Sequence, residues 1–283
     1  GAPNRVALVV NTSGSTGVAK EVGLSASALL ESAKNANKFL GAKPGQIWSL
    51  LLPLTHIAGI NILVRSLELG TLPIDAREIT GKYPFADFTA VVPTQLFRAL
   101  NGDSDLLEHL ISARAVLVGG AALSSDLREG AHNAGIKVIE TYGMTETFGG
   151  IAYNGQPLDG VEVRINKECI ELKSPSLFRA YRGLDNGDAT DGWYKTGDSG
   201  SFDHDRIRVL GRRDDMIITG GENVWPNAVE KVISTFPGIQ HVVVSGIEDE
   251  QWGQRVVAWI VSSREVVPTL ENIRQHVKTQ LPS

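Results

Sequence analysis

The first 140 residues alternate between short apolar runs and longer amphipathic segments. The apolar runs predict buried strands at Val6–Val10, Ile47–Leu51, Ala90–Val92, Ala115–Val118 and Val138–Glu140. The segments between them predict helices over Ser25–Phe39, Ala58–Leu69, Gln95–Leu100 and Ser125–Ala134. Ser25 and Ser125 are suitable N-caps, and Gly41 and Gly135 are suitable stop signals. Strands that alternate with helices in this way indicate a parallel sheet with helices on both faces.

The pattern changes at Gly160. Val161–Ile165 and Cys169–Leu172 alternate in the manner of antiparallel strands. Ser201–Asp203 is expected to pair with Ile207–Leu210 across a short turn. This part of the chain therefore predicts a β-rich subdomain.

A compact α+β unit is predicted beyond Asp214. Its strands are expected near Met216–Ile218, His241–Gly246 and Val256–Val261. Pro226 suits the first position of a helix running to Phe236, and a last helix follows Thr269. The overall prediction is an α/β protein. Its large N-terminal domain, 1–213, has parallel sheets flanked by helices plus the β-rich subdomain, and its small α+β domain covers 214–283.

Composition narrows the function classes. The chain of 283 residues has a net charge of −5, with 42% apolar and 21% charged residues, so it lacks the basic footprint of a nucleic-acid-binding protein. The single cysteine, Cys169, cannot form an internal disulfide, which suits the cytoplasm. No apolar run approaches the roughly 18 residues of a membrane span.

A loop of hydroxyls and glycines, Asn11–Lys20, follows the first apolar run. Glycines let backbone N–H groups approach an anion, hydroxyls donate hydrogen bonds, and a lysine neutralises charge, so this loop is suited to polyphosphate. It is not a Walker A loop, because Val18 and Ala19 separate Gly17 from Lys20. A flexible polar loop is the alternative.

The loop resembles the phosphate-binding signature of the adenylate-forming superfamily, which includes acyl-CoA synthetases and adenylation domains. Further family motifs follow in the expected order. They are Tyr-Gly-x-Thr-Glu at Tyr142–Glu146, Tyr-x-Thr-Gly-Asp at Tyr194–Asp198, and the Gly-Arg-x-Asp-Asp-x-Ile hinge at Gly211–Ile217. Ordered signatures across most of the chain make a coincidence improbable.

The resemblance implies activation of a carboxylic acid by ATP, followed by transfer to coenzyme A. It assigns the β- and γ-phosphates to the loop residues Thr12, Ser13, Gly14, Ser15, Thr16, Gly17 and Lys20. It places Thr145 beside the reacting phosphate and makes Glu146 the ligand of Mg²⁺, a cation that prefers oxygen ligands.

The resemblance also assigns residues to the ribose and the adenine of the nucleotide. Asp198 is expected to accept both ribose hydroxyls, with Arg212 donating to the same sugar. The adenine is expected to lie against a group formed by Gly119, Gly120, Ala121, Tyr142 and Gly143. The alternatives are an N-cap aspartate, a surface arginine and a glycine pair at a strand end.

Candidate residues for the acid are His56, Arg65 and Thr94. His56 could equally be structural. Arg65 lies in a strongly apolar stretch, where a cation costs desolvation energy unless an anion accompanies it. The alternative is an arginine whose head reaches the surface. His-x-x-Gly with an arginine six residues later resembles the o-succinylbenzoate–CoA ligase subgroup, in which that arginine pairs with the second carboxylate.

The resemblance makes Asp214 the hinge on which the small domain rotates, and it places Gly220 and Gly221 at the thiol's approach. The alternatives are a CoA ligase for another aryl or fatty acid, an adenylation module that loads a carrier protein, and a non-catalytic relic. Both ends are expected to be incomplete, since the loop comes early and the family's C-terminal Gly-Lys motif is absent. A homodimer is compatible with the sequence.

Overall fold

The computed structural model describes residues 5–12, 20–182, 189–190, 192–263 and 267–281. The chain forms two compact units. The first comprises Gly1–Arg164, Glu171–Lys195 and Phe202–Ile207, and the second comprises Ile165–Ile170, Thr196–Ser201 and Arg208–Ser283.

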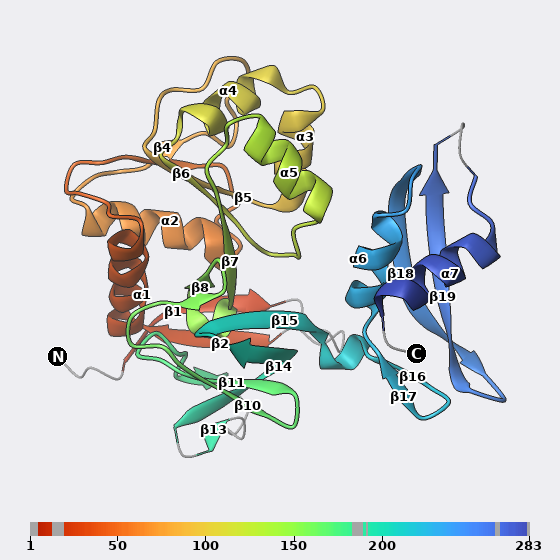
Figure 1. Ribbon diagram of the computed structural model, residues 1–283. Helices are drawn as coiled ribbons and strands as arrows, with labels where there is room; N and C mark the ends of the chain where they lie inside the picture. Colours follow the sequence, from red (N-terminus) through yellow and green to blue (C-terminus); the bar gives the residue numbers. More distant parts are fainter. Residues whose placement is uncertain (1–4, 13–19, 183–188, 191, 264–266, 282–283) are drawn as a thin grey trace. The chain divides into compact units, whose positions relative to one another are not determined.

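A seven-stranded sheet organises the first unit (Figure 1), with the order β4-β3-β5-β6-β7-β8-β9. The first five strands in this order pair in parallel, whereas β8 and β9 are antiparallel. The strands are β3 (Trp48–Leu50), β4 (Ile74–Asp75), β5 (Phe88–Val91), β6 (Ala115–Val118), β7 (Val138–Met144), β8 (Gly149–Tyr153) and β9 (Gln156–Pro157). The predicted parallel sheet is confirmed.

Helices cover both faces of this sheet, as the sequence predicts. They are α1 (Ala26–Phe39), α2 (Ile57–Glu68), α3 (Pro93–Leu100), α4 (Ser104–Ser112) and α5 (Ser125–Asn133). Successive residues of a strand point to opposite faces, so β6 sends Val116 and Val118 into the core under α3, α4 and α5. Its Ala115 and Leu117 enter the core under α1 and α2.

The first strand departs from the prediction. The apolar run at Val6–Val10 forms β1 (Val6–Thr12), but Val6 and Val9 are 48% and 49% exposed, and Val10 is the residue buried. β1 lies at the edge of an antiparallel sheet with β2 (Lys20–Ser25) and β12 (Ala180–Tyr181), in the order β1-β2-β12. A β-branched run indicates strand propensity and does not by itself specify burial.

The helix boundaries agree closely with the predicted ones, apart from the N-cap of α5 and one additional helix. Ser25 caps α1 by accepting a hydrogen bond from Ala28 N, as predicted. The cap of α5 is Ser124 and not Ser125, because the Ser124 hydroxyl accepts from Leu127 N. Helix α4 was not predicted, and Asp103 caps it.

Antiparallel strands follow, as predicted from Gly160 onward. They are β10 (Glu162–Asn166), β11 (Cys169–Lys173), β13 (Ala189–Thr190), β14 (Trp193–Asp203) and β15 (Arg206–Arg212). His204 and Asp205, between β14 and β15, both have positive φ, which suits a tight hairpin turn.

The second unit contains the predicted α+β arrangement. Its sheet has the order β17-β16-β19-β18, with β16 (Ile217–Thr219), β17 (Glu222–Val224), β18 (Ile239–Asp249) and β19 (Gly253–Ser262). Helices α6 (Pro226–Ser234) and α7 (Leu270–Gln280) pack on it through a core that includes Ile217, Ile233, Val244 and Ile273. Pro226 is at the first turn of α6, as expected.

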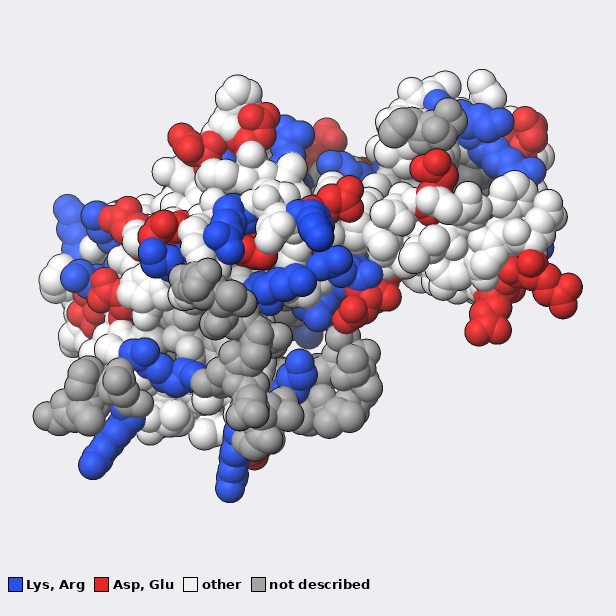
Figure 2. Space-filling model, turned by 90° about the horizontal axis from the view of Figure 1, so that it is seen from below, with Lys and Arg blue, Asp and Glu red and all other residues white. Residues whose placement is uncertain are grey.

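The visible surface carries charges of both signs. Lys and Arg side chains are interspersed with Asp and Glu on the face shown in Figure 2. Among the described residues, exposed ion pairs include Lys173 with Glu162 and Arg182 with Glu21. Pairs of this exposed kind contribute little stability. Within the described ranges, no helix is long and apolar enough to cross a membrane.

Candidate active site

The two described ends of the predicted phosphate loop are held together by the β1–β2 hairpin. Thr12 and Lys20 are register partners, and the Thr12 hydroxyl donates to the Lys20 carbonyl at 3.3 Å. The predicted loop residues Ser13, Gly14, Ser15, Thr16 and Gly17 lie outside the described residues. The Lys20 ammonium lies 5.0 Å from the centroid of the Tyr181 ring, a cation–π distance.

The Tyr142–Glu146 motif occupies the end of β7 and the 3₁₀ turn η1 (Thr145–Thr147). β7 and β8 approach so closely that a Cβ on Gly143 would lie 1.9 Å from the Gly149 carbonyl oxygen. A glycine is therefore required at this position. The Thr147 hydroxyl accepts from Met144 N at 3.0 Å and so fixes the start of the turn.

Helices α1 and α2 hold the residue that follows η1. Phe148 is buried with a φ of 52°, an uncommon conformation for a residue other than glycine. Its carbonyl accepts from the Ser32 hydroxyl at 3.0 Å and from Asn61 Nδ2 at 2.6 Å. Sequence reasoning did not identify Ser32 and Asn61, because nothing local in the sequence links them to the motif.

Glu146 has a chemistry that fits Mg²⁺. Its half-buried carboxylate accepts a hydrogen bond at 2.9 Å from the Tyr181 hydroxyl. Among the described residues, no group of three or more His, Cys, Asp or Glu could hold a metal. Mg²⁺ is commonly bound by one or two carboxylates together with phosphate oxygens, so the single carboxylate of Glu146 is compatible with the predicted role.

The predicted adenine-binding residues follow neighbouring parallel strands. Gly119, Gly120 and Ala121 come directly after β6, and Tyr142 and Gly143 lie in the last part of β7. A Cβ on Gly119 would lie 2.3 Å from the Thr141 hydroxyl, and Gly120 has a φ of +85°. Ligands of open α/β sheets bind at this carboxyl edge.

The candidate ribose-binding pair lies in the second unit. Arg212 Nη1 is 3.4 Å from the Asp198 carboxylate, and Asp198 is buried. Asp198 N donates to the Thr196 hydroxyl at 3.1 Å, which orients the backbone beside the carboxylate. The structure therefore brings together the two residues that the motifs assign to the sugar.

The candidate acid-binding residues occupy different environments. His56 is the N-cap residue of α2, and Thr94 is in the first turn of α3; both are exposed and follow the carboxyl ends of β3 and β5. Arg65 is buried in the last turn of α2, so the alternative of a head group reaching the surface is wrong. Its guanidinium lies 5.1 Å from the Trp48 ring centroid.

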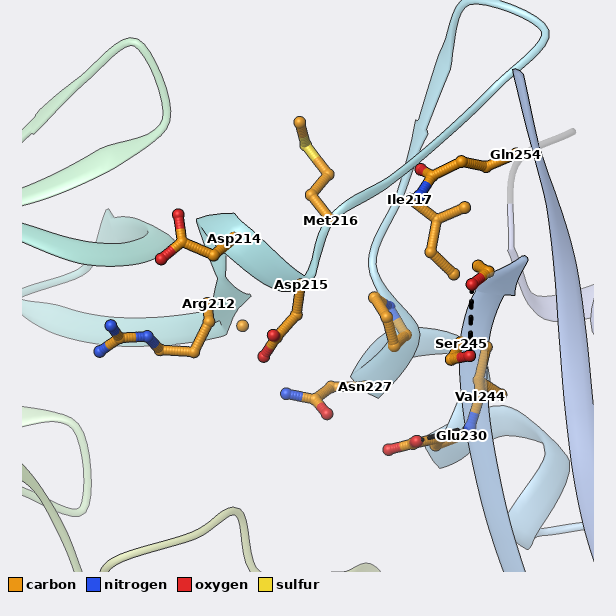
Figure 3. Close-up of a pocket in the computed structure, with 13 residues that line it drawn as sticks. Arg212, Asp214, Asp215, Met216, Ile217, Asn227, Glu230, Val244, Ser245 and Gln254 are labelled. Atoms are coloured by element: carbon orange, nitrogen blue, oxygen red, sulfur yellow. Dashed lines mark hydrogen bonds between the residues drawn. The ribbon is translucent and has the colours of Figure 1, made fainter. Parts of the chain in front are cut away.

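Asp214, the predicted hinge residue, lines a cavity of about 340 Å³ in the second unit (Figure 3). Asp214 belongs to the turn Arg213–Asp215, which leads directly into β16. Asn227 and Glu230 of α6 also line this cavity, and the Glu230 carboxylate accepts from Val244 N at 2.8 Å.

The two glycines predicted at the thiol's approach lie between β16 and β17. Gly220 and Gly221 have φ values of +60° and +88°. A Cβ on Gly220 would lie 2.7 Å from the Trp252 ring, and Gly220 N donates to the Trp252 carbonyl at 2.9 Å. A side chain at Gly220 would therefore disturb this turn.

Two family models match the chain. The model for AMP-binding enzymes covers residues 1–169, and the model for their C-terminal domain covers residues 228–283. With the motifs placed on this fold, the chain belongs to the AMP-binding enzyme family.

Several of the similar proteins in that family are named 2-succinylbenzoate–CoA ligases. A protein of Mycobacterium tuberculosis named probable 2-succinylbenzoate–CoA ligase is 40% identical over 295 residues, covering 98% of this chain and 76% of the relative. Escherichia coli MenE, solved with a phenylether-linked analogue of OSB-AMS, gives a TM-score of 0.82 at 30% identity, over 100% of this chain and 64% of that one. ATP-bound MatB from Rhodopseudomonas palustris gives a TM-score of 0.88 at 26% identity, and the match covers 99% of this chain and 63% of that one. The chain thus spans just under two thirds of these solved relatives.

Proposed function

We propose that this protein is an ATP-dependent ligase that joins o-succinylbenzoate to coenzyme A, releasing AMP and pyrophosphate. The observation that carries the choice of acid is the 40% identity to the mycobacterial protein across 98% of this chain. The AMP-binding family and the motif geometry support the chemistry of nucleotide activation.

A carboxylate reacts poorly with a thiol, because its leaving group would be oxide. Transfer of AMP to the acid gives a mixed anhydride, which the thiol of coenzyme A can attack. In this proposal Lys20, Thr12 and the loop hydroxyls hold the β- and γ-phosphates, and Thr145 lies beside the reacting phosphate. Mg²⁺ on Glu146 would neutralise phosphate charge when bound.

The motifs assign residues to both ends of the nucleotide. Asp198 accepts the ribose hydroxyls, Arg212 donates to the sugar, and the strand-end group that includes Gly119 and Tyr142 contacts the adenine. Fixing the nucleotide in this way orients the α-phosphorus toward the acid.

The acid site contains His56, Thr94 and Arg65 in this proposal, with Arg65 directed to the ring carboxylate. Asp214 remains the proposed hinge, and 214–283 the proposed mobile domain. Gly220 and Gly221 are proposed to line the path of the thiol. A cytoplasmic location and a homodimer remain expectations from the sequence.

An acid panel tests this function. The protein is supplied with ATP, Mg²⁺, coenzyme A and either o-succinylbenzoate, benzoate, a medium-chain fatty acid or malonate, and AMP formation is measured. The expected result is coenzyme A-dependent AMP formation with o-succinylbenzoate at a kcat/KM at least tenfold above the others. A preference for another acid would support the alternative ligase. Acid-dependent exchange of pyrophosphate with ATP, with no AMP formed when coenzyme A is added, would support a carrier-loading module.

A further inference from the structure

The Tyr181 hydroxyl lies between a carboxylate and a second phenol. It is 2.9 Å from Glu146 Oε1 and 3.2 Å from the Tyr194 hydroxyl. Both tyrosines are only 5% exposed, so the hydrogen bond between the two phenols is shielded from bulk water, while Glu146 is half-buried. Tyr194 is the first residue of the Tyr-x-Thr-Gly-Asp motif. The correspondences with the family assign a role to Asp198 of this motif and none to Tyr194.

The direction of each hydrogen bond follows from counting protons. An ionised carboxylate only accepts, so the single proton of Tyr181 is donated to Glu146. Tyr194 must then donate to the Tyr181 oxygen, which gives the order Tyr194 to Tyr181 to Glu146.

The same segment also holds the Glu146 backbone and Lys20. Phe178 N donates to the Glu146 carbonyl at 2.7 Å, and the Phe178 ring packs on that of Tyr181 at a centroid distance of 4.6 Å. The Tyr181 ring faces the Lys20 ammonium. Strand β12 pairs with β2 through Tyr181 and Val22, close to Lys20.

We infer that Tyr181 is a positioning residue that orients the metal-binding carboxylate of Glu146 through its hydroxyl and the phosphate-binding ammonium of Lys20 through its ring, with Tyr194 fixing the direction of the hydroxyl. This role rests on the proposed function. It gives a role to Tyr181 and Tyr194, to which the family motifs assign none. It also explains why a phenol is placed between two charged groups.

The two parts of this role can be separated by substitution. Tyr181→Phe removes the hydroxyl and keeps the ring, whereas Tyr181→Leu removes both. ATP binding is measured by titration calorimetry without acid, at a series of Mg²⁺ concentrations. Loss of an outer hydrogen bond to a metal ligand typically weakens metal binding about tenfold or more, so Tyr181→Phe should raise the half-saturating Mg²⁺ concentration by about that factor.

Other readouts distinguish positioning from stability. AMP binding without Mg²⁺ should stay within about twofold of wild type in Tyr181→Phe, since AMP lacks the β- and γ-phosphates. Tyr181→Leu should weaken ATP binding further, and also at saturating Mg²⁺, because Lys20 loses its ring. Tyr194→Phe should shift the Mg²⁺ dependence in the same direction by a smaller factor. Tyr83 is a half-buried tyrosine packed on His109. Its substitution Tyr83→Phe is the matched control and should change neither the Mg²⁺ dependence nor the binding of ATP.

The decisive comparison uses Glu146→Gln. If Tyr181 acts through the carboxylate, adding Tyr181→Phe to Glu146→Gln should produce no further change in Mg²⁺ dependence. An unchanged Mg²⁺ dependence in Tyr181→Phe, beside a wild type that binds Mg²⁺ and ATP, would overturn the positioning role and leave the proposed function intact. A wild type with no Mg²⁺-dependent ATP binding would overturn both.

Discussion

Arg65 Nη2 donates a hydrogen bond of 2.9 Å to the hydroxyl of Tyr153, although both side chains are buried. Burial raises the pKa of Tyr153, and the nearby Arg65 opposes that rise, so the partner of the guanidinium is a neutral phenol. In the described part of the chain, the Arg65 Nε has no hydrogen-bond partner, and the contacts of the guanidinium are the Trp48 ring and the Tyr153 hydroxyl. A buried cation with neutral neighbours is costly, and an anionic ligand would offset that cost.

The first prediction concerns that anion. Arg65→Ala should reduce kcat/KM for o-succinylbenzoate by a factor of hundreds, since breaking a buried ion pair costs about 3–5 kcal/mol. Arg65→Lys keeps the charge but loses the planar fork, so its loss should be smaller yet clear. The comparison is with an analogue that lacks the ring carboxylate, for which both losses should be slight. Equal losses for the two acids would make Arg65 a structural residue.

A second prediction follows from a buried histidine. His109 is 4% exposed, and its Nε2 lies 2.8 Å from the Ser49 hydroxyl. Burial lowers the pKa of His109 below its usual value of about 6.5, so the unfolded chain binds a proton more readily than the folded one. The stability that neutral, buried His109 contributes is complete above about pH 6.5. It is lost as the pH falls toward the pKa of His109 in the folded state, by at most about 1.4 kcal/mol per pH unit.

Urea unfolding at pH 7.5 and at pH 5.5 measures this effect. The free energy of unfolding should fall less between the two pH values in His109→Gln than in the wild type, whatever the variant's stability at pH 7.5. The exposed His132 provides the control, because His132→Gln should leave the wild-type difference in place. A His109→Gln variant with the full wild-type pH dependence would contradict the prediction.

Local pattern was sufficient for most of the fold and insufficient for the contacts that organise the site. The strand β6 and the cap of α1 follow from apolar runs and a serine beside a periodic segment. The burial of β1 could not be predicted, because the exposed fraction of Val9 depends on which elements cover it. Tyr181 carries no local signal either, since its contact with Glu146 spans 35 residues and depends on β12 pairing with β2.

A third prediction tests the close approach of β7 and β8. Gly143→Ala places a Cβ against the Gly149 carbonyl, a backbone group that cannot move aside cheaply. It should lower the free energy of unfolding by about 1–3 kcal/mol or more. Gly130→Ala is the matched control, because Gly130 is inside α5 and its nearest neighbour is a Leu100 methyl at 3.4 Å. There alanine should stabilise by about 0.5–1 kcal/mol. Equal effects would refute the packing argument.

The last prediction separates the two ends of the nucleotide site by kinetics. Asp198→Ala removes the proposed acceptor of both ribose hydroxyls, and hydrogen bonds to a charged group contribute about 1.5–3 kcal/mol each, so the KM for ATP should rise at least about tenfold. Glu146→Gln keeps the size of the side chain but removes the charge that holds Mg²⁺, so kcat should fall more than ATP binding weakens. Asp203→Ala, an exposed carboxylate on the same strand as Asp198, should match the wild type in both parameters. Acid-dependent pyrophosphate release at varied ATP gives kcat and KM for each variant. A kcat defect in Asp198→Ala with an unchanged KM would move that residue from the sugar to the reacting centre.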